Sequence, residues 1–111
     1  MSTDFNLVSE LHDKTLVIKT DGYINNTGGE QIVQEFSKHS GVNKLILNLE
    51  KSKVVNSIGI SHLIEVIEKL NQENGKLVFT NLDPTIEKTF TIMGLFQFAG
   101  KADTVEAALS S

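Results

Sequence analysis

The stretch Val54-Val55-Asn56-Ser57-Ile58-Gly59-Ile60-Ser61-His62-Leu63 decides the fold, because it marks the start of a long helix. Asn56 and Ser57 are good helix caps, since a short polar side chain binds the free N–H groups of a first turn. Apolar residues then recur at helical spacing and predict one buried stripe: Ile60, Leu63, Ile64, Ile67 and Leu70. Gly59 disfavours a helix by about 1 kcal/mol relative to alanine, but it allows another backbone or a partner to approach closely. The start of a helix is also a natural position for an anion or a phosphate.

The polar residues near this helix start fall mainly off the apolar stripe: Ser57, Ser61, His62 and Glu65. We therefore expect the start of the helix to face solvent. The helix is predicted to run to about Asn74, with Gly75 as its stop. Glu65 and Lys69 have the spacing of a helical ion pair.

Upstream of this helix, the sequence predicts a hairpin and a shorter helix. Residues 5–12 alternate apolar with polar side chains, as in a strand with one wet face, and residues 16–18 supply the second strand. Thr27 and Glu30 have the spacing of a capping box, which indicates that a helix begins there. That helix is expected to end near Ser40-Gly41.

Downstream, Asp83-Pro84 is a strong helix start, because aspartate caps and proline tolerates the first helical position. The buried face of this helix is predicted to contain Ile86, Phe90 and Met93, and the helix is predicted to end at Gly94. Residues 95–99 are expected to include a short strand. Asp103 and Glu106 resemble a second capping box, before a short terminal helix.

Two nearly continuous apolar runs predict strands that are buried on both faces: Lys44–Leu49 and Leu77–Thr80. Because these strands alternate with helices long enough to cross over, the predicted fold class is α/β with a mostly parallel central sheet. About four helices should pack on that sheet. The length of 111 residues suits one domain that spans residues 1–111.

Composition excludes several functions. The formal net charge is −4 and no basic block occurs, so nucleic acid is not expected as the main partner. Cysteine is absent, which excludes a disulfide framework and a cysteine nucleophile. No apolar run approaches the roughly 20 residues of a membrane span, and the N-terminus lacks the pattern of a secretory signal. We therefore expect a cytoplasmic protein that does not insert into a membrane.

The sequence offers no support for a metal site, a cofactor or catalysis. Three histidines lie far apart and lack the tight spacing of metal motifs: His12, His39 and His62. Gly28-Gly29 lacks the lysine and hydroxyl residue of a phosphate loop, so it indicates a turn. Glu65 and Glu68 are explained better by a solvated helix face than by acid–base catalysis.

Several segments together carry a family resemblance: Lys44–Leu49, Asn56–Ile60, Gly75–Val78, Met93–Leu95 and Asp103–Leu109. Through their order and spacing, residues 5–109 resemble a STAS domain, the fold of bacterial anti-anti-sigma factors, which are also called anti-sigma factor antagonists. The resemblance implies a non-enzymatic switch protein that binds a serine kinase-like anti-sigma factor when it is unphosphorylated. A monomer or a weak dimer is expected.

The sequence departs from that family where the switch lies. The central motif typically reads Asp, Ser, Ser or Thr, Gly, Leu, and the hydroxyl residue directly before the glycine is phosphorylated. Here Asn56 stands at the Asp position and Ile58 stands at the acceptor position, and isoleucine cannot accept phosphate. Ser57 is then either a helix cap or a displaced phosphoacceptor. Ile58 either packs inward or forms an exposed apolar contact.

The resemblance predicts a partner-binding surface of Asn26, Asn56, Ser57, Ile58, Gly59, Ser61 and His62, with Asn25 and Thr27 nearby. The first candidate function is a regulator of the anti-anti-sigma type. The alternative is a STAS subunit of a transporter-associated lipid-trafficking complex or of a signalling assembly. A neighbouring gene for a kinase-like anti-sigma factor would favour the first, and a transporter operon the second. A small enzyme or nucleotide-binding domain has no supporting motif.

Overall fold

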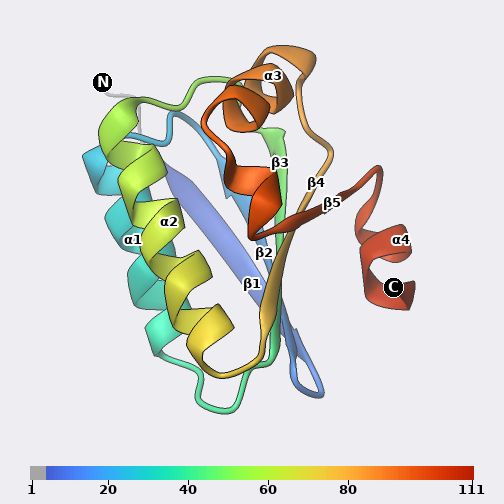
Figure 1. The fold of residues 1–111 in the computed structure, drawn as a ribbon. Helices are drawn as coiled ribbons and strands as arrows, with labels where there is room; N and C mark the ends of the chain where they lie inside the picture. The colour runs from blue at the N-terminus through green and yellow to red at the C-terminus, as the bar shows by residue number, and fades with distance from the viewer. Residues whose placement is uncertain (1–4) are drawn as a thin grey trace.

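Five strands form one mixed sheet in the order β1-β2-β3-β4-β5 (Figure 1), in a computed structural model that describes residues 5–111. The strands are β1 (Asn6–His12), β2 (Thr15–Asp21), β3 (Lys44–Lys51), β4 (Lys76–Thr80) and β5 (Gly100–Ala102). The first two strands form the predicted antiparallel hairpin, and the pairs from β2 to β5 are parallel. The predicted α/β fold with a mostly parallel sheet is therefore confirmed.

Helices cover the two faces of the sheet unequally. Four helical segments lie on one face: α1 (Asn26–Ser37), α2 (Ser57–Gln72), α3 (Pro84–Ile92) and the 3₁₀ turn η1 (Leu95–Gln97). The terminal helix α4 (Val105–Ser110) lies on the opposite face, apart from the others in Figure 1. In β3, Leu45 and Leu47 pack toward the large helical layer and Ile46 packs toward α4. The predicted burial of β3 on both faces follows from this alternation.

A buried lysine holds α4 on its face. The Lys44 side chain in β3 donates hydrogen bonds to the main-chain oxygens of Ala108 and Ser111, the latter at 2.9 Å. Burial lowers the pKa of Lys44, and the nearby charge of Lys76 adds to that shift. A cation at the carboxyl end of a helix satisfies carbonyls that have no partner within the helix.

The apolar stripe of α2 is mostly as predicted. Its buried residues are Ile60, Leu63, Val66, Ile67 and Leu70. Ile64, which was predicted to be buried, is 37% exposed. Since α2 packs against α1 as well as the sheet, the buried face is rotated toward Val66 and away from Ile64.

The predicted helix ends are partly wrong. The helix α2 stops at Gln72, and the left-handed residue after it is Asn74 (φ +62°) rather than Gly75. A Cβ on Gly75 would lie 2.8 Å from the main-chain oxygen of Asn43, so glycine serves a close backbone approach there. The helix α1 stops at Ser37, before the predicted end, and Gly41 is left-handed (φ +76°) in the loop that follows.

The region after β4 needs three corrections. Asp83 caps α3 as predicted, accepting a hydrogen bond from the Thr85 N–H at 3.0 Å, but Met93 is exposed. Residues 95–97 form a 3₁₀ turn, and the short strand comes later, at residues 100–102. The cap of α4 is Thr104, whose hydroxyl accepts from the Ala107 N–H at 3.1 Å, and not Asp103.

Candidate functional site

The starts of α1 and α2 lie side by side, at the same end of the two parallel helices (Figure 1). The chain segments that lead into them are joined as a parallel bridge between Ile24 and Val55. The Ile24 N–H donates to the Val54 oxygen at 3.0 Å, and the Asn56 N–H donates to the Ile24 oxygen at 3.2 Å. The backbone therefore fixes the two helix starts relative to each other.

Both helices begin with the same cap. The side-chain oxygen of Asn25 accepts from the Gly28 N–H at 3.0 Å, and that of Asn56 accepts from the Gly59 N–H at 2.8 Å. The predicted capping box that begins at Thr27 is therefore wrong, because the cap of α1 is Asn25. Ser57 is not the cap of α2 either. It is the first helical residue, and it is exposed.

The glycine three residues after each cap admits the neighbouring backbone. A Cβ on Gly59 would lie 2.1 Å from the main-chain oxygen of Ile24, and a Cβ on Gly28 would lie 2.9 Å from that of Tyr23. The close approach predicted at Gly59 is thus made by the chain itself. Gly28-Gly29 was predicted from the sequence to form a turn, but both residues lie inside α1.

His62 bridges the two helices. Its Nε2 lies 3.0 Å from the side-chain oxygen of Asn26, and its Nδ1 lies 3.8 Å from a carboxylate oxygen of Glu65. The side chain is 21% exposed, and a Cβ on Gly29 would lie 2.6 Å from the ring. His62 therefore packs in the space that Gly29 leaves, rather than standing free on the surface. Glu65 also forms the predicted ion pair with Lys69, at 3.3 Å.

The remaining predicted site residues stand in solvent: Asn26, Thr27, Ser57, Ile58 and Ser61. Ile58 is 53% exposed, so it does not pack inward. Sequence reasoning missed Tyr23 and Val54, two exposed residues directly before the bridge that joins the helix starts. Each lies two positions before an asparagine cap, and this shared spacing is the signal that could have identified them. We call Tyr23, Val54 and the five residues above the helix-start surface.

Neither α1 nor α2 has an acidic residue in its first turn, so the partial positive charge of both helix starts is uncompensated by side chains of the helices. The Ser61 hydroxyl donates to the Ser57 main-chain oxygen at 3.1 Å, so this hydrogen bond does not direct it to a base. Within residues 5–111, no group of three or more His, Cys, Asp or Glu side chains could hold a metal ion.

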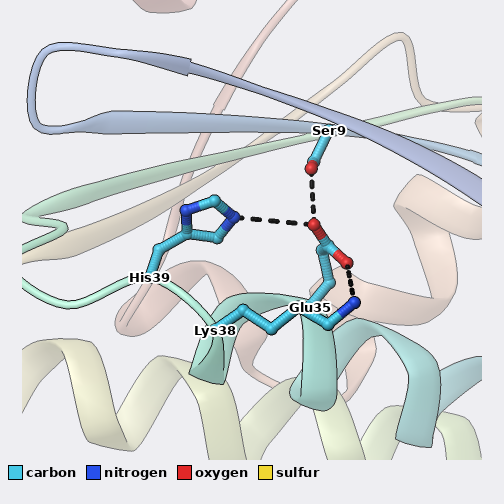
Figure 2. Close-up of polar contacts among 4 residues, drawn as sticks. All are labelled: Ser9, Glu35, Lys38 and His39. Carbon is cyan, nitrogen blue, oxygen red and sulfur yellow. Dashed lines mark hydrogen bonds and ion pairs between the residues drawn. The ribbon is translucent and has the colours of Figure 1, made fainter.

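A second polar cluster lies away from this surface. Figure 2 shows Glu35 of α1 surrounded by Ser9 of β1, Lys38 and His39. The Ser9 hydroxyl donates to Oε2 of Glu35 at 2.5 Å, and His39 Nε2 lies 3.5 Å from the same oxygen. The Lys38 Nζ lies 3.2 Å from the other carboxylate oxygen, Oε1. The hydrogen bond from Ser9 is the main cause that lowers the pKa of Glu35, and Lys38 and His39 add to it against the opposing effect of burial. The cluster fastens the edge strand to α1.

The described part of the chain contains no helix that is long and apolar enough to cross a membrane.

An α/β fold with a mostly parallel sheet is the architecture that the sequence resemblance implied. The STAS domain profile matches residues 6–108, and the chain belongs to this family. A curated relative is BtrV of Bordetella bronchiseptica strain RB50, which carries the name of an anti-sigma factor antagonist. It is 27% identical over 101 residues, which cover 89% of this chain and 87% of BtrV.

Solved structures agree with the family assignment. The phosphorylated form of SpoIIAA, a cell fate determinant of Bacillus, has a TM-score of 0.74 and 26% identity, covering 96% of this chain and 97% of that one. An anti-sigma factor antagonist from Mycobacterium paratuberculosis has a TM-score of 0.82 at 21% identity. The match covers 96% of this chain and 92% of that one. This second likeness shows that the fold is shared.

Proposed function

We propose that this protein is a non-enzymatic regulator of the anti-anti-sigma type, which binds a protein partner through the helix-start surface. The observation that carries the proposal is the exposure of Ile58 in the first turn of α2. A large apolar side chain held in solvent by a rigid helix start is a suitable anchor for a protein interface. Tyr23 and Val54 extend the apolar area, and Asn26, Ser57 and Ser61 supply a polar rim.

The proposed partner is an anti-sigma factor of the serine kinase-like type. The names of two relatives, BtrV and SpoIIAA, describe anti-sigma factor antagonists and support an anti-sigma factor as the partner. Such a partner also suits the chemistry of the surface, since two helix starts without acidic side chains favour an acidic group opposite them. This function implies a location in the cytoplasm.

Regulation by phosphate must differ from that of the phosphorylated relative. SpoIIAA has been solved in a phosphorylated form. In this chain Ile58 has no hydroxyl, so the proposed regulation takes one of two forms. Either binding is constitutive, or the exposed Ser57 is a displaced acceptor. A phosphate on Ser57 would carry about −1.5 to −2 charges at the positive end of α2, where it would stabilise the folded monomer. It would weaken binding, because the partner must desolvate the phosphate or repels it with its own carboxylates.

Titration calorimetry tests the binding proposal, with the kinase-like anti-sigma factors of the same genome as purified probes. Ser61→Glu should weaken the complex at least tenfold, because the new carboxylate repels the acidic group proposed on the partner. Ser110→Glu is the matched control, because the Ser110 hydroxyl is also exposed and also donates to the main-chain oxygen four residues earlier, at 3.2 Å. Both variants should keep wild-type stability within about 0.5 kcal/mol. Equal affinity of the two variants would show that the partner binds elsewhere.

Kinase assays with ATP and mass spectrometry separate the two forms of regulation. Phosphate on Ser57 that abolishes binding supports the displaced acceptor, and absence of phosphate supports constitutive binding. Phosphate at another residue, such as Ser61, would contradict both.

A further inference from the structure

A second apolar surface lies between α2 and the junction of α3 with η1. A groove of about 480 Å³ runs there, lined on the α2 side by Ile64 and Ile67 and on the other side by Met93, Leu95 and Phe98. Ile92, which precedes Met93 in the chain, is exposed at the end of α3. Large apolar side chains gathered on one surface of a soluble protein usually mark a contact site.

This surface has both a groove and exposed apolar side chains of a size to enter the same groove on a second copy. Phe98 is 64% exposed, and Met93 and Ile92 are also exposed. A two-fold symmetric interface requires this arrangement, because each copy must offer both the protruding group and the space that receives it. The volume of the groove admits the aromatic ring of Phe98 from a second copy.

This surface has charges of both signs, so two copies of it are electrostatically complementary. Glu68 of α2 lines the groove, and Lys88 of α3 lies one helical turn before Ile92. Within residues 5–111, neither Glu68 nor Lys88 forms an ion pair. When α3 of one copy packs along α2 of the other, Lys88 meets Glu68 of the second copy, and two-fold symmetry repeats the pair.

We propose that a second copy of this chain occupies the groove, forming a symmetric dimer with Phe98 at its centre and a pair between Lys88 and Glu68 on each side. Only four of these apolar side chains are exposed, namely Ile64, Ile92, Met93 and Phe98. They make a centre smaller than the about 800 Å² per partner of a standard interface, so the dimer is weak. The groove lies along the C-terminal half of α2, whereas the start of α2 belongs to the helix-start surface.

Sedimentation equilibrium of the full chain, from about 10 μM to about 1 mM, tests the proposal because a weak dimer responds to concentration by mass action. The average mass should rise from 12.2 kDa toward twice that value. Phe98→Asp should weaken association at least tenfold. Val8→Asp is the matched control, since Val8 is also 64% exposed but lies on β1. It should leave association unchanged.

Charge exchange tests the orientation of the two copies. Glu68→Lys alone and Lys88→Glu alone should each weaken the dimer severalfold, and the double variant should restore it. Circular dichroism must show that all variants are folded. A monomer at the highest concentration, a dimer insensitive to Phe98→Asp, or a dimer broken by Val8→Asp would overturn the proposal. A double variant that fails to restore association would overturn the pairing of Lys88 with Glu68.

Discussion

Replacing Gly59 with alanine should destabilise the protein strongly, although helix propensity alone favours alanine by about 1 kcal/mol. The added Cβ would lie 2.1 Å from the main-chain oxygen of Ile24, so one of the two backbones must move by about 1 Å. The Ile24 backbone cannot yield freely, because its N–H and its oxygen are hydrogen-bonded to Val54 and Asn56. Overpacking at the upper end of its usual range costs about 3 kcal/mol, and a lost hydrogen bond costs about 1 kcal/mol. After the gain in propensity, we expect a net loss of about 3 kcal/mol.

Urea unfolding followed by circular dichroism measures this loss. Gly100→Ala is the matched control, because a Cβ added to Gly100 would meet a methyl group of Val78 at an ordinary 3.7 Å. The control should change the free energy of unfolding by less than about 0.5 kcal/mol. If Gly59→Ala is as stable as the wild type, the contact with Ile24 does not select glycine at this position, and the rigid pairing of the helix starts is refuted.

Three further changes test other parts of the structure. Leu63→Ala removes a fully buried side chain from α2 and should cost about 2–5 kcal/mol in urea unfolding; a loss within experimental error would contradict the packing. Gly29→Ala should displace the His62 ring and separate it from Asn26, seen as altered imidazole NMR shifts, with His12 shifts unchanged as the control. Glu35 has a lowered pKa in the folded state, so its contribution to stability is present above the ordinary value of 4.5 and is lost as pH falls through the lowered pKa. Glu35→Gln should therefore lose less stability than the wild type between neutral pH and pH of about 3, and equal losses would show that the cluster is not formed.

Sequence patterns predicted the layers well because burial dominates them. The runs around Leu45 and Leu77 could only be strands covered on both faces, and the spacing from Ile60 to Leu70 could only be a helix with one buried side. The error at Ile64 arose because periodicity gives the width of an apolar stripe but not its rotation, which depends on how closely α1 approaches α2.

The candidate site was harder to predict, because its geometry depends on contacts between distant segments. The exposure of Ser57 and Ser61 was predicted from their position off the apolar stripe, whereas the sequence left the exposure of Ile58 open. The pairing of Ile24 with Val55 did not, since a single bridge leaves no periodic pattern in the sequence. The role of Gly29 as the space for His62 was hidden for the same reason, as the two residues belong to different helices.

The order of the strands in the sheet has a consequence for synthesis on the ribosome. Every strand pairs with the strand before it in the sequence, so no strand must be inserted between two that have already formed. The hairpin of β1 and β2 can assemble first, and each later strand is added, with its helix, to the growing edge. Emerging segments therefore find their pairing partners already present, which shortens the time during which an apolar strand such as β3 is exposed to aggregation. The last segment to emerge, α4, closes the opposite face over Ile46 and receives Lys44.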